Sequence, residues 1–236
     1  MKRNVSLAEI SDGRLYGSGD MVRADCHGCQ GCFQCCEGMG TSVILDPLDA
    51  HRMEMGTGKQ LTQLLSEGYV ELNVVDGIIL PNLRMSGPKE RCAFLNEEGR
   101  CSIHLSRPGI CRLFPLGRYY ENGDFRYFLQ TGECRESSRS KVKVSKWIDT
   151  PDQGRYHDFV CRWHYFLKEL EERVAGEEDS AGAKRLNLLL LEKFYLTPYS
   201  GERDFYEQFQ ERMEACEGLF LSVMVESDAD DRRENE

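Results

Sequence analysis

Five of the eleven cysteines in this chain lie within residues 26–36, and this run constrains the fold more than any other feature of the sequence. Thiolates spaced three residues apart repel one another and oxidise readily. In a reducing compartment they therefore usually converge on a cation that accepts several soft ligands. Cysteines serving only as small buried apolar residues would not need this spacing. We expect a metal site here, with zinc or iron as the ion.

A disulfide framework is the weaker interpretation of the same cysteines. Such frameworks belong to small secreted domains, whereas this chain has 236 residues and an odd number of cysteines. Its first residues, MKRNVSLAEISDG, lack the apolar segment of a signal peptide. No apolar run approaches the roughly 20 residues that a bilayer-spanning helix needs. We expect a cytoplasmic protein that does not enter a membrane.

The net charge of −10 bears on possible partners. Affinity for a phosphate backbone comes from clustered Lys and Arg side chains that displace counterions. An acidic chain of this kind is therefore not expected to bind nucleic acid.

Two spacing patterns overlap in the cysteine run. Residues 29–36 read CxxCxxCC, and residues 26–36 also fit the C-x2-C-x2-C-x3-C spacing of bacterial ferredoxins. In ferredoxins three of these cysteines hold one cluster, the fourth can reach another, and a proline follows. Here Glu37 stands in place of that proline. The spacing leaves open which thiols share an ion. The candidate ligands of the run are Cys26, Cys29, Cys32, Cys35 and Cys36.

A second group of candidate ligands follows later in the chain: Cys92, Cys101, Cys111 and Cys134. Cys92 and Cys101 flank an expected turn at residues 96–99, and Cys111 follows a Pro108-Gly109 turn. Alone, these cysteines fit core positions equally well. Together with the first run they give nine candidate thiolates, enough for a [4Fe-4S] cluster plus a zinc ion, or for two clusters.

These motifs resemble a known family. CxxCxxCC at residues 29–36 is followed by CAFL at Cys92, GRCSIH around Cys101 and RPGICRLFP at residues 107–115. This order is similar to that of the YkgJ-like cysteine-cluster family, a zinc- or iron-chelating domain, over about residues 26–135. The resemblance implies that the matching cysteines are the metal-binding set together with Cys134, whereas Cys26 lies just outside the four-cysteine motif. That set is Cys29, Cys32, Cys35, Cys36, Cys92, Cys101 and Cys111.

Flagellin lysine N-methylases are similar in their cysteine-rich part, and this similarity raises lysine methyl transfer as an activity. The chain shows no glycine-rich nucleotide loop of the Rossmann type. No residue is identified as catalytic.

Other side chains are weaker candidates. His27 and His104 stand beside candidate ligands and are expected to form hydrogen bonds rather than to ligate a metal. Cys161 and Cys216 are expected to be core residues of helices. Three arginines either offset thiolate charge or lie on a solvated surface: Arg107, Arg112 and Arg118. The remaining histidines are expected to be ordinary helix residues: His51, His157 and His164.

The remaining patterns predict an α+β fold. Asp46-Pro47 begins a helix through about residue 55, and a second helix covers about 60–67. Asp76-Gly77 joins a hairpin of residues 69–75 and 78–85, and a second hairpin pairs 113–120 with 125–130. Helical periodicity begins at residue 152 and continues in segments 183–196 and 203–225.

We therefore expect four parts. Residues 1–25 form an irregular N-terminal segment and 26–148 a cysteine-cluster metal-binding domain. Residues 149–226 form a helical region packed on that domain, and 227–236 a disordered acidic tail.

Three functional hypotheses follow. The first is an iron-sulfur protein with a redox or cluster-assisted role toward an unknown protein or redox partner. The second is an interaction module whose zinc ion contributes most of the folding energy. The third is a lysine N-methyltransferase resembling the flagellin enzymes.

Overall fold

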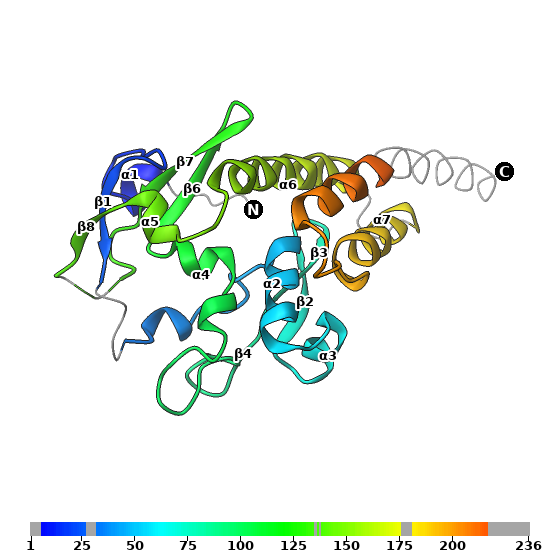
Figure 1. Ribbon diagram of the computed structural model, residues 1–236, viewed down its shortest axis with the longest axis horizontal. Coiled ribbons are helices and arrows are strands. Elements are labelled where there is room, and N and C mark those ends of the chain that lie inside the picture. Colours follow the sequence, from blue (N-terminus) through cyan, green and yellow to red (C-terminus); the bar gives the residue numbers. More distant parts are fainter. Residues whose placement is uncertain (1–5, 27–31, 135, 137, 176–180, 217–236) are drawn as a thin grey trace.

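A computed structural model of the protein describes residues 6–26, 32–134, 136, 138–175 and 181–216. It has an α+β fold, as the sequence predicts, in which small antiparallel sheets are joined by helices (Figure 1). Each helix within these ranges is too short or too polar to span a bilayer. The predicted acidic tail lies outside the described residues. The division into four parts stays a prediction.

Helices α2 (Pro47–Thr57) and α3 (Leu61–Ser66) begin and end close to where the sequence predicts them. The Asp46 side chain caps α2 by accepting a hydrogen bond from the backbone N–H of Asp49. The chain then forms a hairpin of β2 (Val70–Val75) and β3 (Ile78–Leu83). Asp76 and Gly77 both have positive φ, which a primed two-residue turn requires and which the Asp-Gly pair predicts.

The segments that carry the later cysteines are short. Strands β4 (Met85–Ser86) and β5 (Arg91–Cys92) form a two-residue ladder. The 3-10 turn η3 (His104–Ser106) leads into the single-turn helix α4 (Gly109–Leu113). Another 3-10 turn, η2 (Gln34–Cys36), carries the end of the first cysteine run.

The second predicted hairpin is present with a tighter turn. Strands β6 (Leu116–Glu121) and β7 (Asp124–Leu129) are joined by Asn122 and Gly123 alone. Both turn residues have positive φ, so this is also a primed turn. Strand β6 begins at Leu116 and not at residue 113, as was predicted, because residue 113 still belongs to α4.

Residues 6–25, part of the segment that the sequence suggested would be irregular, contain two short regular elements. These are helix α1 (Leu7–Ile10) and strand β1 (Met21–Asp25). Strand β1 pairs with β8 (Ser140–Lys143), more than a hundred residues away. Its alternation of buried Val22 and Ala24 with exposed neighbours explains the strand. Five residues are too short for that pattern to stand out in the sequence.

Helix α5 (Val144–Ile148) leads into the long helix α6 (Gln153–Val174), which lies beside hairpin β6–β7 (Figure 1). Helical periodicity is predicted from residue 152 onward, and the apolar residues of α6 at this spacing are buried, among them Tyr156, Phe159 and Trp163, whereas Leu167 is half-buried. Helix α7 (Ala181–Leu191) continues into a π-helical turn, η4 (Glu192–Leu196), and residues 205–216 are helical.

One hydrophobic core runs through the described residues. It joins the strands and helices around the cysteines to the C-terminal helices, with Leu45, Met53 and Leu64 on one side and Leu186 and Phe194 on the other. Two polar contacts cross the same boundary. The Tyr195 hydroxyl donates to the Leu45 carbonyl at 2.8 Å, and Asn187 Oδ1 accepts from the Ile79 N–H at 2.6 Å.

Candidate metal centre

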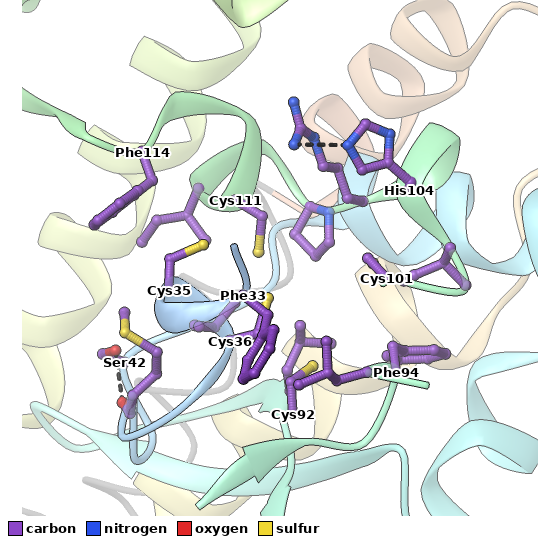
Figure 2. A pocket seen from close by; sticks show the side chains of 18 of the residues that line it. Phe33, Cys35, Cys36, Ser42, Cys92, Phe94, Cys101, His104, Cys111 and Phe114 are labelled. Carbon is purple, nitrogen blue, oxygen red and sulfur yellow. Dashed lines mark hydrogen bonds between the residues drawn. The ribbon is translucent and has the colours of Figure 1, made fainter. Parts of the chain in front are cut away.

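A cavity of about 580 Å³ lies where η2, the loop after β5 and helix α4 meet (Figure 2). Cys35 reaches it from η2 and Cys111 from α4, so that these two sulfur atoms face the same space. The walls between the sulfurs are largely apolar, with aromatic rings from Phe33, Phe94 and Phe114. The predicted ligands that line the cavity are Cys32, Cys35, Cys36, Cys92, Cys101 and Cys111.

The η2 segment is held in place by its backbone and by Arg91. The Cys36 N–H donates to the Phe33 carbonyl at 2.8 Å, and the Gly38 N–H donates to the Glu90 carbonyl at 3.0 Å. The Arg91 guanidinium lies over the Phe33 ring, 5.6 Å from its centroid, and its Nε is 3.2 Å from a carboxylate oxygen of Glu37. These contacts tie the first cysteine run to β5, which ends at Cys92.

Cys92 and Cys101 flank a closed loop, as the sequence predicts. The Asn96 N–H donates to the Arg100 carbonyl at 2.9 Å, and Asn96 Oδ1 accepts from the Arg100 N–H at 2.7 Å. Gly99 completes the turn with a φ of +71°, which side chains rarely adopt. The loop therefore returns the chain so that both cysteines line one cavity.

Cys111 is positioned by the start of α4. Pro108 is the N-cap residue, and the N–H of Gly109 donates to Oδ1 of Asp49 at 2.7 Å. Asp49 is buried and also accepts from the Asp46 N–H at 3.3 Å, so α2 and α4 share one carboxyl group. Burial, with a further contribution from Asp46, raises the pKa of Asp49 to about 8.

Burial and neighbouring groups hold the cavity thiols in their neutral form. Burial raises the pKa of the Cys92, Cys101 and Cys111 thiols, and neighbouring thiols add to the rise at Cys92 and Cys111. At Cys35 the hydrogen bond with Cys36 is the largest cause of a raised pKa. The free thiols are therefore neutral near pH 7, and a metal ion must displace their protons when it binds.

The cysteine sulfurs are not gathered as tightly as one zinc ion requires. In a tetrahedral site with Zn–S bonds of about 2.3 Å, the sulfurs lie about 3.8 Å apart. Among the residues that the structure describes, no three cysteine sulfurs lie within 4.8 Å of one another. A cluster of several iron and sulfide ions holds its thiolates farther apart than a single ion does. The thiol donors fit zinc and iron alike.

Two further candidate ligands stand apart from this cavity. Cys26 and Cys134 do not line it. Burial raises the pKa of Cys134, and the nearby Cys26 and Cys32 thiols add to that rise. Cys26, Cys32 and Cys134 are therefore treated as a second group of thiols. Cys32 also belongs to the first group, because it lines the cavity. Cys29 lies outside the described residues.

Of the other candidates, His104 and Arg107 line the cavity. Arg107 NH1 lies 3.2 Å from Nε2 of His104, so this ring nitrogen is engaged with a neighbour, and whether His104 ligates a metal stays a prediction. Arg112 instead donates to the carbonyls of Arg107, Asp149 and Leu105, the last through a short contact. His27 lies outside the described residues.

Arg118 does not line the cavity and donates to the Tyr156 hydroxyl at 2.6 Å. Arg107 lowers the pKa of Cys35 and Cys101, although larger causes outweigh it, and Arg100 also lines the cavity.

The sequence did not single out Asp49 or the aromatic wall of the cavity. Asp49 is the third residue of α2, where an acid completes a capping box with Asp46, so the sequence signal for that role was present. Its second role, holding α4, depends on a contact across 60 positions of the chain. Of the two cysteines expected in helix cores, Cys216 is fully buried and Cys161 is half-buried.

Residues 28–142 match the profile of a family described as "CxxCxxCC: Putative zinc- or iron-chelating domain". The matched segment contains every cysteine that lines the cavity, and also Cys134. It ends before α6 and leaves Cys26 just outside. No curated protein and no solved structure matches the chain significantly.

Proposed function

From the match of residues 28–142 to a zinc- or iron-chelating family, we propose that this protein is an iron-sulfur protein. Cys35, Cys92, Cys101 and Cys111 would hold one [4Fe-4S] cluster in the cavity. When bound, such a cluster supplies one-electron transfer or a Lewis-acidic iron. The protein would use it in a redox or cluster-assisted role toward a partner that is still to be identified.

The observation that supports this proposal has two parts: several thiols line one cavity, and their sulfur atoms stay apart from one another. Six thiols line one cavity of about 580 Å³, yet no three of the described cysteine sulfurs approach within 4.8 Å. A structural zinc site is normally closed, with four ligands in contact with one ion. A polynuclear cluster fills more space and needs the apolar walls that limit solvent access to it.

The same arrangement supports a division of the ligands. Cys35, Cys92, Cys101 and Cys111 come from separate segments around the cavity, and the pKa of each is raised by burial or by a neighbouring thiol. Cys26, Cys32 and Cys134 form the second group and would hold a second metal centre. In this division Cys36 hydrogen-bonds to Cys35 and is a supporting residue of the first centre.

Zinc is the alternative, because the family description includes it. A zinc ion that drew the cysteines of the cavity together would make the protein an interaction module stabilised by its metal. The sulfurs would then have to move closer than they lie here, so the loop around Gly99 and helix α4 would shift on binding.

The deciding experiment measures iron, acid-labile sulfide and zinc per chain in anaerobically purified protein. Oxygen strips clusters and lets zinc occupy their thiolates, so a parallel aerobic preparation shows whether any zinc is secondary. About four iron and four sulfide per chain, the content of one [4Fe-4S] cluster, support the proposal, and about twice that supports two clusters. Stoichiometric zinc without sulfide in the anaerobic preparation overturns it.

A further inference from the structure

A second group of metal-ligand side chains lies outside the cysteine cavity. Asp124, His157 and Cys161 each offer one ligand atom, and the three atoms lie within 4.8 Å of one another. This is the one group of three or more such side chains with that spacing in the part of the chain that the structure describes. None of the three lines the cavity.

These side chains come from two regular elements. His157 and Cys161 are four residues apart on α6, so they occupy the same face of the helix. Asp124 is the first residue of β7, at the tip of the β6–β7 hairpin that lies beside α6 (Figure 1). The Gly123 N–H donates to the Tyr165 hydroxyl at 3.0 Å, and the Phe125 ring stacks on His157 at 4.6 Å. The hairpin tip is thus fixed on the helix.

The side chain that stands between the other two distinguishes metal ligation from nucleophilic catalysis, and here it favours ligation. In a catalytic triad the imidazole stands between the nucleophile and the carboxylate. Here the Asp124 carboxylate is the shared neighbour. Its Oδ1 lies 2.8 Å from Nε2 of His157 and 3.9 Å from the Cys161 sulfur. Burial, with Asp124 and Asp158 adding to it, raises the pKa of the Cys161 thiol to about 11, which is the opposite of an activated nucleophile.

The surroundings of His157 fit a metal ligand. Its Nε2 faces the group, and its Nδ1 lies 3.7 Å from a carboxylate oxygen of Asp158, an ion-pair distance longer than a hydrogen bond. Metal-bound histidines commonly direct their other ring nitrogen to a carboxylate, which orients the ring. The side chains of Asp124 and His157 are 64% and 39% exposed, so an ion can reach them from solvent.

We propose that Asp124, His157 and Cys161 form a zinc site separate from the cysteine cavity. Zinc accepts this mixture of carboxylate, imidazole and thiolate ligands, with a water molecule completing the tetrahedron. This site has one thiolate ligand, whereas the proposed cluster site in the cavity has four. The zinc site is also open to solvent. Cys161 therefore has a role beyond the helix core position that the sequence suggested.

Alkylation of Cys161 tests the site directly. Trypsin releases residues 156–162 as a peptide with a single cysteine, so mass spectrometry reads this thiol separately from all others. The protein is used as purified anaerobically, with its own metal content, and is treated with iodoacetamide with and without added Zn²⁺. We expect zinc at about ten times its dissociation constant to slow alkylation of Cys161 by about tenfold, because only the zinc-free fraction of the site then reacts. Mg²⁺ should leave the rate unchanged.

The variants His157→Ala and Asp124→Asn should abolish this protection. His164→Ala is the matched control, because it removes another ring-stacked histidine from the same helix and should keep the protection. The wild-type protein should also bind one more zinc per chain than Cys161→Ser at equal iron content. Unchanged alkylation in wild type, or equal protection in His157→Ala, overturns the proposal and leaves a His–Asp pair that only clamps the hairpin.

Discussion

The backbone N–H of Gly109 donates a 2.7 Å hydrogen bond to Oδ1 of Asp49, and this bond joins α2 to the first residue of α4. Cys111 lies two residues further on, in a helix of only five residues. A helix this short has little stability of its own. The position of one cavity thiol therefore depends on a buried carboxyl group that does not itself line the cavity.

Replacing Asp49 should reduce metal content without removing a ligand. Asp49→Ala leaves the buried Gly109 N–H without an acceptor, at a cost of about 1–3 kcal/mol, and should lower the iron or zinc bound per chain. Asp49→Asn keeps an oxygen that can accept from Gly109 and should retain more metal than the alanine variant. Equal metal content in the two variants would show that the hydrogen bond does not position Cys111.

Cysteine substitutions should separate ligands from core positions. Cys111→Ser should lose iron and sulfide, because serine is a poor ligand for soft metals and cannot replace the thiolate. Cys216→Ala is the matched control, since this cysteine is fully buried outside the cavity and alanine adds no polar group. It should keep its metal. Metal analysis and visible absorbance of both proteins decide the comparison, and equal metal retention contradicts the ligand assignment.

Gly99→Ala should destabilise the loop between Cys92 and Cys101. A Cβ at this position lies 2.7 Å from a carbon of the Phe33 ring, and the positive φ itself costs about 1–2 kcal/mol for a residue other than glycine. We expect a lower melting temperature and weaker metal binding. Gly154→Ala is the control. Its Cβ meets nothing closer than 4.0 Å, and alanine in the first turn of α6 should raise stability by up to about 1 kcal/mol.

His164 should make the fold sensitive to mild acid. Burial, with nearby Lys168 and Arg118 adding to it, lowers the pKa of this imidazole from 6.5 to about 4. Between these two values the unfolded chain binds a proton that the folded chain does not, so the free energy of unfolding falls as pH decreases from 6.5 to 4. His164→Phe keeps a ring against Tyr120, which stacks on His164 at 3.5 Å, and removes the titration.

Urea denaturation of both proteins at several pH values checks this prediction. The free energy of unfolding of wild type should fall more steeply below pH 6.5 than that of His164→Phe. The metal ligands also titrate with pH, but they are common to the two proteins and cancel in the difference. Parallel pH dependences would show that His164 does not contribute.

The regular elements with strong local signals were predictable from the sequence. Asp46-Pro47 marks the start of α2, and Asp76-Gly77 marks a primed turn, because each pair imposes its own backbone geometry. Strand β1 was missed because its pairing partner β8 lies more than a hundred residues away. Five residues carry too little periodicity to reveal such a pair.

The sequence was enough to predict which cysteines take part in the candidate site, but not which of them share one ion. Spacing and motif order pointed to nine cysteines, and six of them line one cavity. Which thiols share an ion depends on how η2, the Gly99 loop and α4 pack, and these contacts are long-range. His157 and Cys161 carried a weak signal as a pair four residues apart on a helix, but Asp124 joins them only through the fold.

The thiols that line the cavity come from positions far apart in the order of synthesis, from Cys32 to Cys111. A ribosome therefore exposes the N-terminal thiols well before the chain contains their partners. During that interval they have no assembled site and are open to oxidation or to capture by whichever soft ion is present. The oxygen level while the protein is being made, and not only during purification, should therefore determine how much of it acquires the correct metal.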